Sequence, residues 1–169
     1  MHREFCKSPK ILDYTEIFLH ANCWTIVFGE KMKVFMLLEP DFEDQIQKRF
    51  GDSGGVYWLR CMEKKGQDKF VRISRTIDND DGGILYIGKA ERLQTRLKNL
   101  RRCIVPDHKS KKHICGRRYN SNSNLKKKFP LNRLCVSVKR ANNPEELEKK
   151  NLDKYFKKYG DLPPLNRQV

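Results

Sequence analysis

The sequence lacks any segment that would hold it in a membrane and any cysteine pattern typical of an extracellular protein. Its longest apolar run is Val34-Phe35-Met36-Leu37-Leu38, far shorter than the roughly 20 residues of a membrane-spanning helix. The opening residues carry charge without an apolar stretch behind them, so no secretory signal is expected. The six cysteines include no Cys-x-x-Cys pair, which favours free thiols in a reducing compartment. We therefore expect a cytoplasmic protein without a membrane partner.

Internal repeats are also lacking, and 169 residues are enough for one domain with a small extension. Acidic residues are few beside basic ones, because 36 Lys and Arg stand against 21 Asp and Glu, which gives a formal net charge of +15. A field of that sign attracts polyanions, nucleic acid first and anionic membrane second. A soluble basic protein without such a partner would have the same composition, so charge alone does not decide the function.

The hydrophobic pattern divides the chain into an N-terminal extension, residues 1–50, packed on a core of residues 51–169. The core predicts an α/β fold of the α+β kind, a small, mostly antiparallel sheet of three to four strands flanked by helices. Strands are expected over 23–29, 32–38, 55–62, 69–77, 84–88 and 131–140, with 55–62 and 69–77 paired as a hairpin. Helices are expected over 9–22, 40–50, 90–102 and 144–159, and a polar, basic loop over 105–124.

Two strand tyrosines stand beside glycines, Tyr57 in "GVY" and Tyr86 in "YIG". A strand tyrosine usually serves packing. On a helical wheel Arg96 lies at the edge of the apolar stripe of its helix, with Lys89 on the same edge, although such an arginine more often only extends past the stripe into water. Gly88 ends the strand, and a backbone without a side chain would let DNA come close there.

The last predicted helix carries a carboxylate in register with its apolar stripe. Leu152, Tyr155 and Tyr159 form the stripe, and Glu148 lies four residues before Leu152. A carboxylate on a buried face needs a partner, which is either a basic residue in a structural ion pair or a hard divalent cation. Glu145 shares that side of the helix, and Glu148 is the preferred ligand.

Together these pieces resemble the GIY-YIG nuclease superfamily. The resemblance runs from "GVY" through "LYIGKA", the arginine motif Leu93-x-x-Arg96-Leu97 and the late helical Glu148 to "PPLN", over about residues 55 to 166. It implies the GIY-YIG nuclease fold and a metal-dependent endonuclease that cleaves double-stranded DNA with one Mg²⁺ or Mn²⁺ ion. The expected products carry a 5′ phosphate and a 3′ hydroxyl.

The small stand-alone chain with inserted loops is most similar to the type II restriction enzymes of that superfamily, which implies sequence-specific cleavage. A palindromic target would suggest a homodimer. Two alternatives remain open. One is a structure-selective or homing-type nuclease, and the other is an inactive DNA-binding module on the same scaffold.

The resemblance also implies roles for individual residues. The family commonly has a His one turn after the arginine, where this chain has Leu100, and the candidates to replace it are Lys89, His108, His113 and Tyr119, with Lys89 and His113 preferred. The implied catalytic set is Tyr57 as general base or proton relay, Tyr86 orienting the water or phosphate, Arg96 on the scissile phosphate, Glu148 on the metal, Asn166 stabilising the closing segment, and Lys89.

The basic segment after the arginine helix is predicted to contact DNA, since Lys and Arg follow phosphates and can reach guanine edges. Cys103, His108, His113 and Cys115 would offer an alternative zinc site, but their spacing fits no common structural pattern. The residues predicted to contact DNA are Lys109, Lys111, Lys112, His113, Arg117, Arg118, Tyr119, Lys126 and Lys127.

Overall fold

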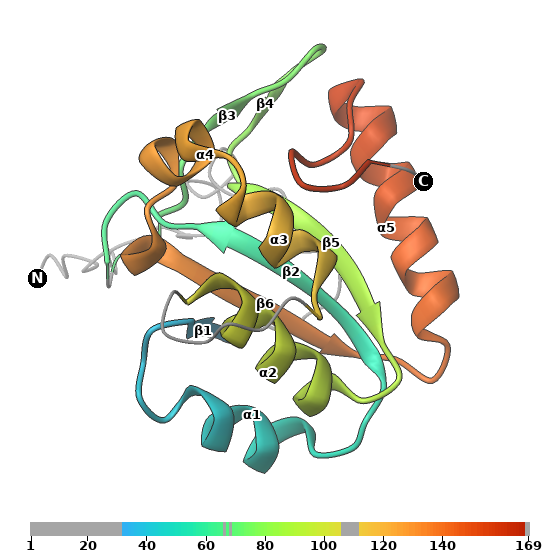
Figure 1. Cartoon of the computed structure of the whole chain (residues 1–169). Helices are drawn as coiled ribbons and strands as arrows, with labels where there is room; N and C mark the ends of the chain where they lie inside the picture. The colour runs from blue at the N-terminus through green and yellow to red at the C-terminus, as the bar shows by residue number, and fades with distance from the viewer. Residues whose placement is uncertain (1–31, 66, 68, 106–111, 168–169) are drawn as a thin grey trace, which may run out of the picture.

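The computed structural model describes residues 32–65, 67, 69–105 and 112–167. Helices and strands mix along the chain, with one sheet between two helical layers (Figure 1). In chain order the elements are β1 Val34–Met36, α1 Phe42–Phe50, β2 Gly55–Cys61, β3 Ile73–Ser74, β4 Asn79–Asp80, β5 Ile84–Ala90, α2 Leu93–Ile104, α3 Ile114–Asn120, α4 Ser123–Lys128, the 3-10 turn η1 Leu131–Arg133, β6 Leu134–Arg140 and α5 Pro144–Tyr159.

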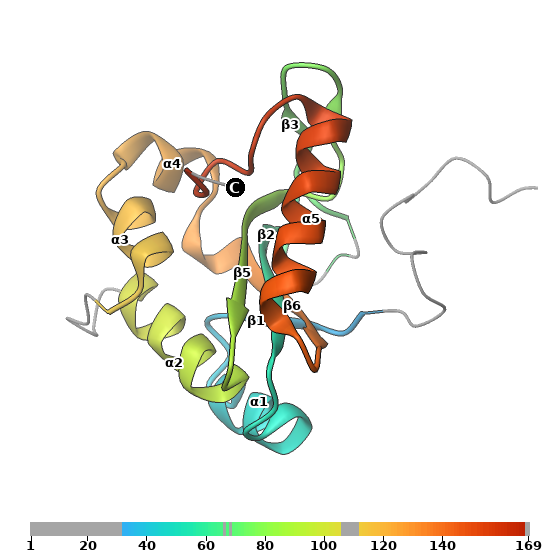
Figure 2. The same cartoon turned by 90° about the vertical axis from the view of Figure 1, so that its right-hand side faces the viewer.

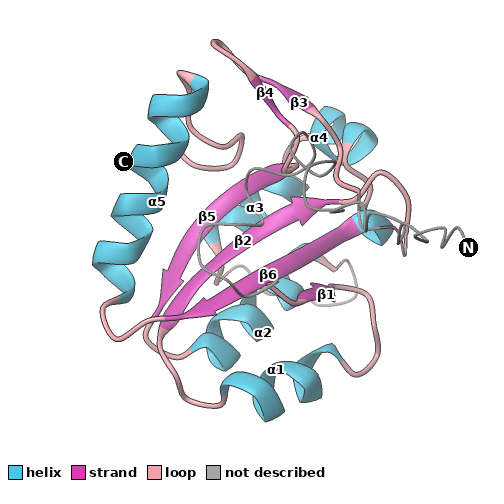
Figure 3. Ribbon diagram, turned by 180° about the vertical axis from the view of Figure 1, so that it is seen from behind, coloured by secondary structure: helices cyan, strands magenta, loops and turns pink. Residues whose placement is uncertain are grey.

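The main sheet has four antiparallel strands in the order β1-β6-β2-β5, which confirms the predicted α+β class and antiparallel sheet. Figure 3, seen from behind, shows these strands side by side. β2 lies between β6 and β5, and six of its seven residues are buried. Its run of β-branched, aromatic and aliphatic side chains suits a strand covered on both faces.

Each face of the sheet has its own apolar cluster, because successive side chains of a strand point to opposite faces. Tyr57 and Leu59 of β2 pack with α1, α2 and α3 on one face. Val56 and Trp58 pack with α5 on the other. Figure 2 shows the resulting layers, with β5 at the near edge between α2, α3 and α4 on one side and α5 on the other. None of the described helices is long and apolar enough to cross a membrane.

The described part of the N-terminal 50 residues shares this sheet and core. Val34 of β1 pairs with Ser137 of β6, and Phe42 and Ile46 of α1 are buried. Glu43 on α1 accepts ion pairs from basic residues of α2, which ties the two helices together. The helix and strand predicted over 9–22 and 23–29 lie outside the described residues.

Two local predictions are wrong. The segment 69–77 is not a continuous strand paired with β2, because its backbone pairing there is limited to an isolated bridge between Met62 and Phe70 and β3 then pairs with β4 instead. The basic segment 105–124 is not all loop, since α3 and the start of α4 fall within it. Cys115 and Tyr119, four residues apart, are both buried on one face of α3. Most residues around them are polar, so this helical spacing does not stand out in the sequence.

The β3–β4 hairpin fixes the point at which α5 ends and the C-terminal segment begins. The N–H of Ile77 donates to the Tyr159 carbonyl at 3.0 Å, and the Thr76 hydroxyl donates to the Asp161 carboxylate at 2.9 Å. Gly160 ends α5 with φ +70, a conformation that favours glycine. The chain then crosses back to the edge of β5, where it reaches Asn166.

Candidate active site

Three aromatic rings from separate parts of the chain meet on the α2 face of the sheet. The register of β2 with β5 pairs Tyr57 with Gly88 and Leu59 with Tyr86, which brings the two tyrosines to one face. His113, immediately before α3, joins them, and its Nε2 lies 2.7 Å from the Tyr57 hydroxyl. The three pairs of ring centroids are 6.0, 6.1 and 6.0 Å apart. The structure therefore brings His113, but not Tyr119, to the tyrosine pair.

Gly88 is required by this ring cluster, and its role as an opening for DNA stays a prediction. A Cβ atom at Gly88 would lie 2.4 Å from the Tyr86 ring and 2.7 Å from the Tyr57 hydroxyl. These separations are well inside van der Waals contact, and both rings are fixed by packing. The missing side chain thus makes room for the tyrosines.

Arg96 extends from α2 towards both phenols. Burial raises the pKa of Tyr57 well above its usual value, and the charge of Arg96 and its hydrogen bond to the phenol act in the opposite direction. The pKa of Tyr86 is also raised, mainly by burial, and Arg96 again opposes the shift. The guanidinium is therefore placed to stabilise a phenolate, since a nearby positive charge favours the ionised form.

His113 is neutral in this environment. Burial, assisted by the charge of Arg96, lowers its pKa from 6.5 to about 3. Its Nδ1 is buried and makes no hydrogen bond within the described residues. With the proton on Nδ1, the ring accepts the Tyr57 hydroxyl at Nε2; with the proton on Nε2, the ring donates to the phenol oxygen. The first tautomer is the one that can take a proton from Tyr57.

Two further site residues meet at the outer edge of β5. Glu148 Oε1 accepts the backbone N–H of Lys89 at 3.0 Å. The Asn166 side chain accepts from the Ile87 N–H and donates to the Ile87 carbonyl, both at 2.9 Å. Asn166 therefore pairs with β5 as another strand would. Charges act across this edge of the sheet, because Arg96 opposes the rise in the pKa of Glu148 and Glu148 adds to the rise in the pKa of Tyr86. The site therefore includes residues from both faces of the sheet.

Glu148 fits a single divalent cation. One carboxylate oxygen is used by the Lys89 N–H, while Oε2 makes no hydrogen bond within the described residues and is free to ligate. Burial raises the pKa of Glu148, and the Lys89 N–H and the charges of Lys89 and Arg96 oppose this. The described residues contain no group of three His, Cys, Asp or Glu side chains placed to hold a metal. A cation at Glu148 would therefore take its remaining ligands from water and substrate, as Mg²⁺ commonly does.

The zinc alternative finds no support in the described part of this cluster. His113 directs Nε2 to Tyr57, and the Cys103 thiol donates to the His113 carbonyl. Burial raises the pKa of the Cys115 thiol far above its usual value, which disfavours the thiolate that a metal needs. His108 lies outside the described residues.

The helical wheel predicted that Lys89 lies beside Arg96, and this prediction is wrong. Lys89 belongs to β5 rather than to the helix and pairs with Val56, whose side chain packs on the α5 face. Its ammonium makes an ion pair with Glu145 at 2.6 Å. The strand continues through Ala90 because β2 still offers Gly55 as a pairing partner, and the wheel argument failed for that reason.

The residues predicted to contact DNA fall into two groups. His113 and Tyr119 are buried, and the Tyr119 hydroxyl donates to the Phe129 carbonyl, so the predicted direct contact of these two with DNA is wrong. Lys109 and Lys111 lie outside the described residues. The remainder sit on or beside α3 and α4: Lys112, Arg117, Lys126 and Lys127 are exposed, and Arg118 is half-buried.

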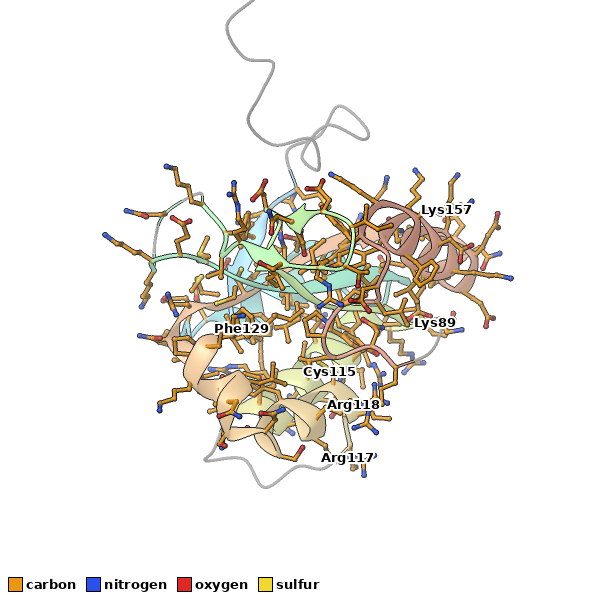
Figure 4. All side chains as sticks on the ribbon, turned by 90° about the horizontal axis from the view of Figure 1, so that it is seen from above. Lys89, Cys115, Arg117, Arg118, Phe129 and Lys157 are labelled. Carbon is orange, nitrogen blue, oxygen red and sulfur yellow. The ribbon has the colours of Figure 1, made fainter. Side chains whose placement is uncertain are left out.

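Two contacts that shape the site have no signal in the sequence. Arg118 donates to the Leu165 carbonyl at 2.7 Å and so ties α3 to the C-terminal segment. The backbone N–H of Lys89 orients Glu148. Figure 4, seen from above, shows Arg117 and Arg118 on the α3 side of the molecule and Lys89 nearer to α5. Compared with known proteins, the chain matches no protein-family model, no curated protein and no solved structure.

Proposed function

We propose that this protein is a metal-dependent GIY-YIG endonuclease that hydrolyses phosphodiester bonds of double-stranded DNA, acting as a type II restriction enzyme. The observation that supports this most is the 2.7 Å contact between the Tyr57 hydroxyl and His113 Nε2, beside Arg96 and near Glu148. Phosphodiester hydrolysis needs a proton acceptor, contacts to the phosphate and relief of the developing charge. A phenol–imidazole pair, a guanidinium and a partly free carboxylate supply these.

In this proposal Tyr57 and His113 form a proton relay. The attacking water gives its proton to the Tyr57 oxygen as Tyr57 passes its own proton to His113 Nε2. A neutral His113 has a lone pair on Nε2 for that proton, but its low pKa makes it a weak base, so the relay needs the negative charge of the bound phosphate to favour the imidazolium. Tyr57 has no exposed surface, so the attacking water has to reach the phenol from the side of Arg96.

The other residues position the substrate. Arg96 makes a two-pronged contact to the scissile phosphate, and Tyr86 orients the water or the phosphate. Glu148 would hold one Mg²⁺ or Mn²⁺ ion, which when bound polarises the phosphate and offsets the charge on the leaving oxygen. Asn166 keeps the C-terminal segment on β5 and so maintains the edge on which Glu148 sits.

A plasmid digest tests the proposal directly. Purified protein with Mg²⁺ should convert a sequenced plasmid into discrete fragments, and run-off sequencing should locate defined ends with 5′ phosphates. Tyr57→Phe should lose this activity, whereas Tyr119→Phe, which removes the hydroxyl of another buried tyrosine outside the ring cluster, should keep it. Equal cleavage by wild type and Tyr57→Phe, or no Mg²⁺-dependent cleavage by wild type, would contradict the proposal.

A further inference from the structure

The outward side of α3 carries a pair of exposed residues that the fold itself does not use. Ile114 and Arg117 are one helical turn apart and share this side, while Cys115 and Tyr119 point into the core. Ile114 is 40% exposed, although it follows directly after the buried His113. We call Ile114 and Arg117 the outer face of α3. A single exposed aliphatic side chain is common on protein surfaces, and its place beside an exposed arginine is what makes this face a candidate for base contacts.

The charge around this face is almost entirely positive. The sequence has no Asp or Glu between Asp107 and Glu145, while eleven residues in that interval are Lys or Arg. No acidic side chain within the described residues pairs with Arg117. The contrast with α2 is clear, because Lys98 and Arg101 of that helix both form ion pairs with Glu43. Positive charge on α3 and α4 is thus left for an external polyanion.

α3 is rigidly mounted on the core. A Cβ atom at Gly116 would lie 2.6 Å from the Cys103 Cβ, so α3 and α2 are in close contact at that glycine. The Asn120 side chain donates to the Cys103 carbonyl at 2.5 Å. Arg118 adds the tie to Leu165. The outer face therefore has a fixed position relative to the catalytic rings, and little ordering is needed when it binds.

This position lies close to where DNA would be cut. His113 touches Tyr57, and a rise of 1.5 Å per residue places Arg117 only about 6 Å further along α3. Base pairs follow each other at about 3.4 Å along a duplex, so Arg117 lies within reach of the base pairs next to the scissile phosphate. Figure 2 shows α3 and α4 next to each other, on one side of the edge strand β5.

We propose that the outer face of α3 enters the major groove beside the cut and reads base edges, while Lys126 and Lys127 of α4 contact the phosphate backbone. Arginine makes a two-pronged contact with guanine O6 and N7, and an aliphatic side chain contacts the thymine methyl group. Both features are presented in the major groove. This inference rests on the proposed function, because it assumes that the bound polyanion is the duplex being cut.

Sequence selection by a protein that cannot cut tests the inference. Tyr57→Phe protein, in EDTA and without added metal, is used to select duplexes from a library with randomised sequence. It should enrich a defined motif that contains guanine. Adding Arg117→Ala should relax the preference at one or two positions by roughly 5- to 100-fold, the range expected for loss of a bidentate contact. Adding Arg117→Lys should relax it similarly, since the charge remains but the two-pronged geometry does not.

The lysines of α4 should behave differently. Lys126→Ala/Lys127→Ala should weaken binding to all sequences alike and lower the slope of log affinity against log salt by about 2. The control is Lys48→Ala/Lys157→Ala, which removes two exposed lysines on α1 and α5 and should leave the motif unchanged, with a smaller loss of slope. Because all four lysines and Arg117 are exposed or solvent-facing, the variants should fold.

The outcomes separate the two proposals. An unchanged motif in both Arg117 variants, or no motif at all, overturns the inference and leaves the endonuclease proposal to its own test. A motif that depends on Arg117, in a protein whose wild type cuts nothing, supports base reading by the outer face of α3 and overturns both the endonuclease and the position beside a cut.

Discussion

Replacing His113 by Gln tests whether the folded protein holds a neutral imidazole next to the Tyr57 hydroxyl. The pKa of His113 is about 3 in the folded protein and 6.5 in an unfolded chain. Above pH 6.5 the ring is neutral in both states and has no effect on the pH dependence of stability. Between pH 6.5 and about 3 the unfolded chain binds a proton that the folded protein does not, so the free energy of unfolding falls as the pH falls.

The size of this effect follows from the shift. Each pH unit well inside the window costs about 1.4 kcal/mol, and the slope is about half as steep at pH 6.5 itself, so lowering the pH from 6.5 to 4.5 should remove about 2 kcal/mol of stability through His113 alone. Glu148 and Asp80 act in the opposite direction, because burial raises the pKa of both carboxyl groups and the folded state then takes up protons first. The difference between wild type and His113→Gln therefore measures His113, whereas the slope of wild type alone does not.

Urea unfolding at several pH values between 4.5 and 8, followed by tryptophan fluorescence, provides the measurement. Wild type should lose stability relative to His113→Gln as the pH falls below 6.5, and the two curves should run parallel above it. Tyr57→Phe is the control, because it keeps the buried imidazole and should keep the slope. Parallel curves for wild type and His113→Gln down to pH 4.5 would refute the buried, neutral ring and with it the imidazole lone pair that the relay uses.

Four further predictions follow from the site. Tyr57→Phe should slow single-turnover cleavage by roughly 10²-fold or more, the scale of general-base loss. Arg96→Lys should also lose cleavage, because a point charge cannot make the two-pronged contact with the phosphate. Gel-shift assays should show that both variants still bind DNA. Glu148→Gln should abolish Mg²⁺-dependent cleavage, whereas Glu145→Gln, which removes only an exposed ion pair with the neighbouring strand, should leave most of it; the reverse result would move the metal ligand to Glu145. Gly88→Ala should lower the free energy of unfolding by about 1–3 kcal/mol, the usual cost of overpacking, and a shift in the urea midpoint would measure it. Affinity for duplex DNA should fall steeply between 50 and 200 mM salt, since bound Lys and Arg release counterions, and a flat response would argue against a phosphate-contacting surface.

The parts of the fold that could be predicted are those in which periodicity and burial agree. The helices that became α1, α2 and α5 each begin or end at a strong signal, such as Pro144 at the start of α5 and Gly160 after its end, and each has a regular apolar stripe. The strands that became β2, β5 and β6 are short apolar runs between turn residues. Antiparallel pairing followed from these elements because so few arrangements bury all of them at once.

The remaining parts depended on contacts between distant residues. The segment with α3 and α4 has a mostly polar composition, and its helices are stabilised by tertiary contacts such as Gly116 on Cys103, which no local pattern reveals. The same limit applied to the site. Tyr57, Tyr86 and Arg96 meet because of strand register and a helix position that local patterns specify. The link between His113 and Tyr57 spans 56 residues, so spacing could only place His113 among several candidates.

The outer edge of β5 also affects how copies of the chain behave towards one another. An unpaired strand edge is a place where a strand from another chain can add, and proteins generally cover such edges. Here the Leu85 carbonyl accepts from the Leu165 N–H, Ile87 pairs with the Asn166 side chain, and the Lys89 N–H is taken by Glu148. The contacts that shape the site therefore also protect it from edge-to-edge aggregation.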